Sequence, residues 1–237
     1  MVQKRGIMVA LYGYYGYGYY YDPMYILIII SCVIALIAQV KVKSTFNKYS
    51  RVSSSKGMTG AMVAEQLLRS QGIYDVSIQR VSGSLTDNYN PRNKTLNLSD
   101  ATYNSRSVAA IGVAAHECGH AIQHDEGYSF LKFRTMLFPI ASFGSQFSFI
   151  LILLGLFFGS FSVLIDVGII LFSFAVLFQI VTLPVEFNAS SRALALLSDN
   201  GILYDSEVDQ TKKVLSAAAM TYVASAAPAI IQLARLL

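Results

Sequence analysis

Four apolar stretches constrain the fold of this chain most, because each is about as long as a bilayer is thick. Residues 24–40, MYILIIISCVIALIAQV, carry no charge, and about 20 apolar residues let a helix cross the hydrocarbon layer. Residues 137–158 and 161–183 are separated only by Gly159 and Ser160, which predicts a tight membrane hairpin over 137–183. Residues 214–237 predict a fourth span, with a helix lying in the membrane interface as the alternative.

The composition agrees with a membrane protein, because 54% of the residues are hydrophobic and only 14% are charged, outside the range of ordinary soluble domains. The lipid bilayer is therefore an expected partner. Cys32 and Cys118 give no disulfide framework, since the first lies in an apolar run and the second between two histidines. Loop charges that orient the spans explain the net charge of +4, and no basic stripe predicts a nucleic-acid partner.

Loop charges also predict the orientation of the chain. Residues 41–136 contain twelve lysines and arginines whereas the turn at 159–160 contains none, which places the large loop in the cytoplasm. Because the hairpin returns the chain to the side that it left, residues 184–213 are expected in the same compartment. Residues 1–23, with seven tyrosines between residues 12 and 21, are expected to be an N-terminal tail, and a binding element is the alternative.

Hydrophobic periodicity predicts short elements within the large loop. Residues 58–72 space apolar side chains at helical intervals and end at Gly72, which predicts an amphipathic helix. Residues 75–81 and 95–99 alternate as strands, with a turn at 90–93. A small sheet is therefore expected before a long helix that runs from about Ser107 through His124.

That long helix contains all three histidines of the chain, within HECGHAIQH at residues 116–124. On a helix, His116 and His120 are rotated by about 40° and separated by roughly 6 Å, so both rings can reach one metal ion. His124 lies roughly 12 Å along the axis from His116 and is expected to be a polar or supporting residue at the helix end. Cys118 lies about 200° round the helix and faces away. Glu117 completes the zinc-hydrolase pattern H-E-x-x-H, in which this carboxylate is the general base.

A catalytic zinc needs a third protein ligand, and elimination leaves a carboxylate because the chain has no further histidine. Glu186 is the best candidate, since it follows the third span on the side of the motif, and Pro184 predicts that a helix starts there. Its alternative role is that of an acidic residue favoured at a helix N-terminus. Glu126 lacks the glycine turn that one zincin class requires, and Asp166 is expected near the opposite membrane surface.

Several motifs together resemble one known family. AAHECGHAIQH, the preceding GSLTDNYNPRNKTLNLS, the later LPVEFNASSRAL and the leading YYYDPMYILII are similar to the bacterial membrane-bound neutral zinc metallopeptidases, over nearly the whole chain. The resemblance implies a gluzincin-like site in which His116, His120 and Glu186 bind one zinc ion and Glu117 is the base.

The chain departs from the pattern of that family at two places. Asn88 and Asn90 stand where the family has a histidine and an aspartate, so any role of those groups is in question. Ser190 stands where related membrane gluzincins have an aspartate, so a carboxylate that would support a zinc-binding histidine is expected to be missing.

We therefore expect a mainly α-helical integral membrane protein with a small α+β zincin-like cytoplasmic domain, within residues 41–136, that carries the motif helix. Its expected function is hydrolysis of peptide bonds in protein or peptide substrates by a zinc-activated water, with Glu117 as general base. Arg192 or a tyrosine is expected to stabilise the oxyanion, and a structural ion pair is equally open for Arg192. An edge strand that binds extended substrate is expected at Thr95, Leu96, Asn97 and Leu98. The alternative function is a catalytically silent membrane scaffold or quality-control adaptor with a structural zinc.

Overall fold

The computed structural model describes residues 23–158 and 162–237, and the chain is mostly helical over these residues. The expected tyrosine-rich tail and the expected turn at 159–160 lie outside the described residues. Within these described residues, four helices are long and apolar enough to cross a membrane by length and composition. They are α2 (Pro23–Tyr49), α6 (Ser129–Phe157), α7 (Ser162–Asp199) and α8 (Asp205–Leu236).

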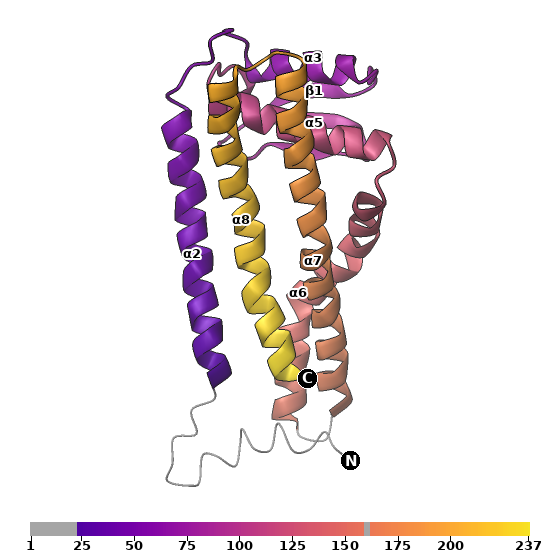
Figure 1. The fold of residues 1–237 in the computed structure, drawn as a ribbon. Coiled ribbons are helices and arrows are strands. Elements are labelled where there is room, and N and C mark those ends of the chain that lie inside the picture. Colours follow the sequence, from indigo (N-terminus) through magenta and orange to yellow (C-terminus); the bar gives the residue numbers. More distant parts are fainter. Residues whose placement is uncertain (1–22, 159–161) are drawn as a thin grey trace.

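The four long helices lie side by side, and the rest of the described chain gathers at one end of them (Figure 1). α6 packs against α7, α7 packs against α8, and α8 packs against α2. The outermost helix, α2, leaves most of its apolar side chains exposed; Ile29 is 63% exposed and Leu36 is 66% exposed. These exposed apolar side chains along α2 form a surface that lipid tails would cover.

The helix expected to start at Pro184 does not start there, because α7 runs without interruption from Ser162 to Asp199. A proline inside a helix removes one backbone hydrogen bond and normally kinks or ends the helix. Here the next turns are held by packing, since Val185 and Ala189 are fully buried against neighbouring elements. Glu186 therefore lies on the same rigid helix as the third span.

The short elements at the end of the bundle form a helix-and-sheet domain. The sheet has the strand order β1–β3–β2, with β1 parallel and β2 antiparallel to β3. The elements are α3 (Gly60–Ser70), β1 (Ser77–Val81), β2 (Asn88–Asn90), β3 (Thr95–Ser99), α4 (Asp100–Tyr103) and α5 (Val108–Asp125). The predicted helix at 58–72, the two predicted strands and the long helix all occur, whereas β2 was not predicted.

The prediction that residues 95–98 form an edge strand is wrong. β3 is the central strand, and Thr95, Leu96 and Asn97 pair on both sides. β2 occupies the edge that was expected to be open. Its three residues, Asn88, Tyr89 and Asn90, include two asparagines, which are depleted in strands, so no alternating pattern indicated it.

The sequence of α5 explains both its start and its burial. The hydroxyl of Ser107 accepts a hydrogen bond from the backbone N–H of Ala110, which caps the first turn. α5 crosses the ends of the long helices (Figure 1) and packs on α3, α7 and α8. Its small residues Ala114, Ala115 and Ala121 are buried in the main hydrophobic cluster. α5 is thus fixed on several sides.

Candidate functional site

His116 and His120 of α5 and Glu186 of α7 come together at the junction of these two helices. Nε2 of His116 lies 3.3 Å from Oε2 of Glu186, and Nε2 of His120 lies 3.6 Å from the same oxygen. One ligand-type atom from each residue lies within 4.8 Å of those of the other two. The three residues expected to be zinc ligands are therefore adjacent in space, although Glu186 follows His116 by 70 residues in the sequence.

A glycine between the two histidines permits this approach. A Cβ added to Gly119 would lie 2.6 Å from the backbone carbonyl oxygen of Ala189, which is closer than real Cβ atoms come to other atoms. The absence of a side chain at this position lets the backbone of α5 lie against that of α7. Ala189 is one turn after Glu186, so the close contact fixes the distance between the carboxylate and the histidines.

Gln123 supports the second histidine and was not predicted to have any role. Its Oε1 lies 3.0 Å from Nδ1 of His120, and its Nε2 donates to the carbonyl oxygen of Val185 at 2.9 Å and to Oδ1 of Asn188 at 2.9 Å. The side chain is fully buried. Gln123 therefore connects His120 to α7 through three hydrogen bonds.

Ser190 supports the first histidine in a similar way. Its hydroxyl oxygen lies 3.1 Å from Nδ1 of His116, on the far side of the ring from Nε2. The position where an aspartate was expected by resemblance thus still contacts the histidine, through a neutral hydroxyl. Both histidines have a hydrogen-bonding partner on Nδ1 and direct Nε2 at Glu186.

Glu117 is a buried carboxyl group next to this cluster. Its side chain is only 7% exposed, and burial raises the pKa of Glu117 above its ordinary value of 4.5, although the charges of His120 and His116 oppose the shift. A carboxyl group with a raised pKa both accepts and returns a proton more readily near neutral pH. The burial of Glu117 therefore suits a proton carrier better than a permanently charged surface group.

His120 has a pKa that reflects its neighbours. Burial opposes its protonation, but the nearby carboxylates of Glu186 and Glu117 outweigh burial, so the pKa of His120 is raised above 6.5 in the metal-free protein. A buried carboxylate beside two rings thus attracts positive charge to this position. That positive charge can come from a proton on the ring or from a bound metal ion.

Two further side chains near Glu186 were not predicted. Nη1 of Arg134, at the start of α6, lies 3.4 Å from Oε1 of Glu186, the oxygen that the histidines do not contact. Tyr222 of α8 lies close enough to interact electrostatically with both Glu186 and Glu117. In the sequence, Arg134 is one of several basic residues beside a predicted span, and Tyr222 lies in an apolar run. No local pattern therefore indicated that either residue lies near Glu186.

Arg192 and Glu126 form an ion pair with each other. Nη2 of Arg192 lies 2.7 Å from Oε2 of Glu126, and its Nε donates to Oδ1 of Asn188 at 2.8 Å. Of the two roles left open for Arg192, the structure shows the ion pair. The carboxylate of Glu126 is thus paired with the guanidinium of Arg192. Glu126 is not part of the group of potential metal ligands found among the described residues.

His124 is held by a tyrosine of the unexpected strand. The hydroxyl of Tyr89 lies 2.8 Å from Nδ1 of His124. Burial raises the pKa of Tyr89 to about 12, so the hydroxyl stays protonated and can donate this bond. His124 therefore joins β2 to the end of α5, as a polar residue at the helix end.

Cys118 and Asp166 are both remote from the cluster. The thiol of Cys118 is fully buried among α3 and α5 and lies 3.6 Å from the carbonyl oxygen of Ala64, and burial raises the pKa of this thiol, which disfavours the thiolate. Asp166 lies on α7 about 30 Å from Glu186, at 1.5 Å per residue. Neither residue can complete the site.

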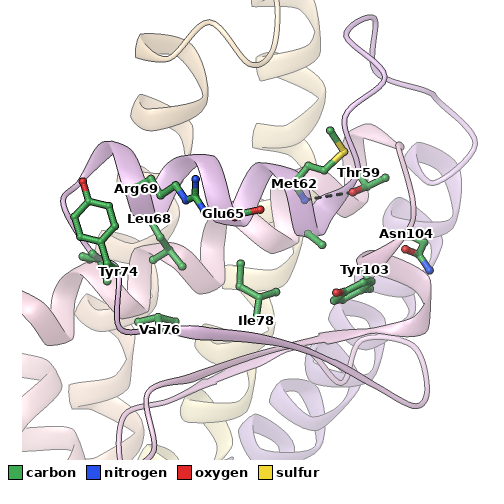
Figure 2. Close-up of a pocket in the computed structure, with 12 residues that line it drawn as sticks. Thr59, Met62, Glu65, Leu68, Arg69, Tyr74, Val76, Ile78, Tyr103 and Asn104 are labelled. Carbon is green, nitrogen blue, oxygen red and sulfur yellow. Dashed lines mark hydrogen bonds and ion pairs between the residues drawn. The ribbon is translucent and has the colours of Figure 1, made fainter.

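A separate pocket of about 550 Å³ lies between α3 and β1. Figure 2 shows that Leu68, Val76 and Ile78 form its apolar wall, while Glu65 and Arg69 pair with each other on α3. It contains no histidine and none of the residues of the cluster. We find no arrangement in it that indicates catalysis.

Comparisons with known proteins identify the family of the chain. The family described as "Putative neutral zinc metallopeptidase" matches residues 24–237, and the chain belongs to this family. A relative from Bacillus subtilis (strain 168), described as "Putative membrane protease YugP", is 50% identical over 198 residues, which cover 84% of this chain and 88% of the relative. No solved structure matches the chain. The family resemblance expected from the motifs is confirmed.

Proposed function

We propose that this protein is a membrane-embedded zinc metallopeptidase of the gluzincin type, with His116, His120 and Glu186 as ligands of one zinc ion and Glu117 as general base. The observation that carries the proposal is the convergence of two imidazole nitrogens and one carboxylate oxygen within 4.8 Å, beside a buried carboxyl group. The family to which the chain belongs supports the zinc and the peptidase activity.

The donor set fits zinc well. Zinc prefers imidazole nitrogen and carboxylate oxygen, and catalytic zinc sites use three protein ligands and leave one position open. A bound zinc ion would polarise the scissile carbonyl group and make water a better nucleophile at neutral pH. Because Glu186 is only 2% exposed and lies between two imidazole rings, the chain itself provides a negatively charged, enclosed position for a dication.

The residues around the ligands have separate tasks in this proposal. Glu117 takes the proton of the attacking water on a carboxylate oxygen and later gives it to the leaving amine nitrogen. Gln123 and Ser190 hold the imidazole rings by their Nδ1 atoms. Tyr222, through its hydroxyl, is our candidate for the donor to the oxyanion, since it adjoins both Glu186 and Glu117.

We propose that extended substrate binds at the outer edge of β2, in place of the edge first expected at β3. β2 is a terminal strand of the sheet and packs against α5. Substrates that add to a strand edge form main-chain hydrogen bonds and so need little side-chain specificity. Protein and peptide segments of many sequences fit such a site.

We propose that the site faces the cytoplasm. Its support is the distribution of basic residues, since the loop that contains the motif carries twelve lysines and arginines. Segments of membrane proteins that extend beyond the cytoplasmic surface would then be the accessible substrates.

The decisive experiment compares the purified wild-type protein with Glu117→Gln on an unfolded protein and on membrane-protein substrates, after equal zinc content is measured. We expect cleavage to fall by about 100-fold or more while bound zinc is unchanged, because glutamine cannot accept the proton. Glu65→Gln, an exposed glutamate on α3, is the matched control and should cleave normally. If wild type and Glu117→Gln bind zinc equally and neither cleaves any substrate, the catalytically silent scaffold is the better function.

A further inference from the structure

We propose that the groove between α2 and α8 is a binding site for the headgroup of an anionic phospholipid. This site is independent of the proposed peptidase function and shares none of its residues. A pocket of about 360 Å³ lies there. Its lining is Lys41, Thr45, Lys48 and Tyr49 from α2 and Lys213, Ser216, Ala217 and Met220 from α8.

The spacing of these residues shows that the pocket is built by two facing helix stripes. The α2 residues follow at intervals of four, three and one, and the α8 residues at intervals of three, one and three, which place each set on one helix face. Tyr49 and Ala217 are the buried hydrophobic residues of this lining. The three lysines come from both walls and share one cavity.

The charge of the pocket is uncompensated. No aspartate or glutamate lines it, and no ion pair found in the described part of the chain includes Lys41, Lys48 or Lys213. The ammonium group of Lys48 lies over the Tyr49 ring, 5.3 Å from its centre. Three exposed lysine side chains around one cavity make its potential positive, so an anion is the expected occupant.

The depth of the pocket identifies the anion as a lipid headgroup. Lys41 is the first charged residue after the apolar part of α2, and Lys213 is the last one before the apolar part of α8. Because Tyr49 packs beside Val214, Lys41 lies about 12 Å deeper than this end of the pocket, at 1.5 Å per residue. The cavity therefore runs across the level at which the apolar region ends and the phosphates of the bilayer begin. Met220 lies about 10 Å deeper than Lys213, at 1.5 Å per residue. It is 50% exposed, so it offers an apolar surface to an acyl chain.

Two lysines on the same helices provide a matched control. Lys43 and Lys212 lie at nearly the same depth as Lys41 and Lys213, yet neither lines the pocket. Lys43→Gln with Lys212→Gln removes the same charge from the same two helices as Lys41→Gln with Lys213→Gln. Any general attraction between basic residues and an anionic membrane is therefore equal in the two double variants.

The experiment measures binding of phosphatidylglycerol and phosphatidylcholine to the purified full chain in detergent, by native mass spectrometry. We expect the wild type to retain phosphatidylglycerol and not phosphatidylcholine. The pocket double variant should bind phosphatidylglycerol roughly 25-fold more weakly, at about fivefold for each lysine, and the control double variant should bind like the wild type.

Equal weakening in both double variants, or equal binding of the two lipids by the wild type, would overturn the proposal. Displacement of the lipid by millimolar inorganic phosphate would also overturn it, because the pocket would then recognise a free anion. Thermal unfolding without added lipid shows whether the variants fold. If the pocket double variant does not fold, Lys213→Gln alone should lower affinity about fivefold, and unchanged affinity would reject the site.

Discussion

The amide oxygen of Gln123 lies 3.0 Å from Nδ1 of His120, and this contact determines which nitrogen of the ring faces the site. The amide nitrogen of Gln123 donates to the carbonyl oxygen of Val185, which can only accept. The oxygen of Gln123 must therefore face His120, so Nδ1 carries a hydrogen and Nε2 is the nitrogen available to a metal. The buried glutamine sets the metal-binding tautomer of His120 before any metal binds.

Gln123→Leu should therefore lower zinc affinity by about 10–100-fold, because the imidazole loses the partner that orients it. Competition with a chromophoric chelator measures the affinity. Asn188→Ala is the control, since it removes one acceptor of Gln123 and leaves the bonds to His120 and Val185 in place. If Gln123→Leu binds zinc as tightly as Asn188→Ala does, the glutamine has no orienting role.

Ser190→Asp should increase zinc affinity, by up to about tenfold, because a carboxylate accepts a stronger hydrogen bond from Nδ1 of His116 than a hydroxyl does. Ser190→Ala should lower the affinity, and Ser190→Asn separates the effect of charge from that of size. The same chelator competition gives all three values. An aspartate variant that binds zinc more weakly than the serine protein would show that the neutral hydroxyl is the better partner here.

The sequence predicted the elements that have a strong local signal. The helix with the histidines was expected from Ser107 to His124 and occurs at Val108–Asp125, because its cap and its small residues follow ordinary helix rules. The strand at 95–99 occurs as expected. Elimination of other ligand types also selected Glu186, which lies in the cluster.

Features that depend on packing could not be predicted from local pattern. Pro184 satisfies the rule for a helix start, yet burial of Val185 and Ala189 keeps the helix continuous. β2 is short and rich in asparagine, so only its pairing with β3 defines it. Gln123 is different. It lies three residues after His120 and so on the same helix face, and its contact with that histidine could have been predicted from the spacing.

Gly119→Ala should separate α5 from α7 and lower zinc affinity by about tenfold or more, because the new Cβ would lie 2.6 Å from the backbone carbonyl oxygen of Ala189. Gly112→Ala is the matched control on the same helix, since its Cβ would meet a side-chain methyl group of Thr211 on α8 and not the backbone of α7. Both changes favour helix formation by about 1 kcal/mol. Thermal unfolding and zinc titration distinguish the two variants.

Unaltered zinc affinity in Gly119→Ala, together with a higher unfolding temperature, would contradict the close contact between α5 and α7. In that outcome the gain in helix propensity would be the main effect of the substitution. A loss of zinc affinity in Gly112→Ala as large as that in Gly119→Ala would show that α5 responds to any added bulk. The specific approach to Ala189 would then lose its support.

The metal-free protein should lose stability as the pH rises above the ordinary histidine value of 6.5, because the pKa of His120 is raised in the folded state. Between 6.5 and that higher pKa the folded state binds more protons than the unfolded state, so the free energy of unfolding falls with pH. The added stability is complete below 6.5 and is lost as the pH passes the folded-state pKa. Zinc should reverse the trend, because deprotonated ligands bind it more tightly.

Unfolding temperatures between about pH 6 and pH 9, measured with a chelator and with excess zinc, test this reversal. The raised pKa of Glu117 acts in the same direction as that of His120, so the Glu117→Gln protein isolates the histidine. In that background His120→Asn should flatten the slope of the metal-free protein. A slope that survives His120→Asn would assign the pH dependence to another group and remove His120 as the proton-binding residue that zinc displaces.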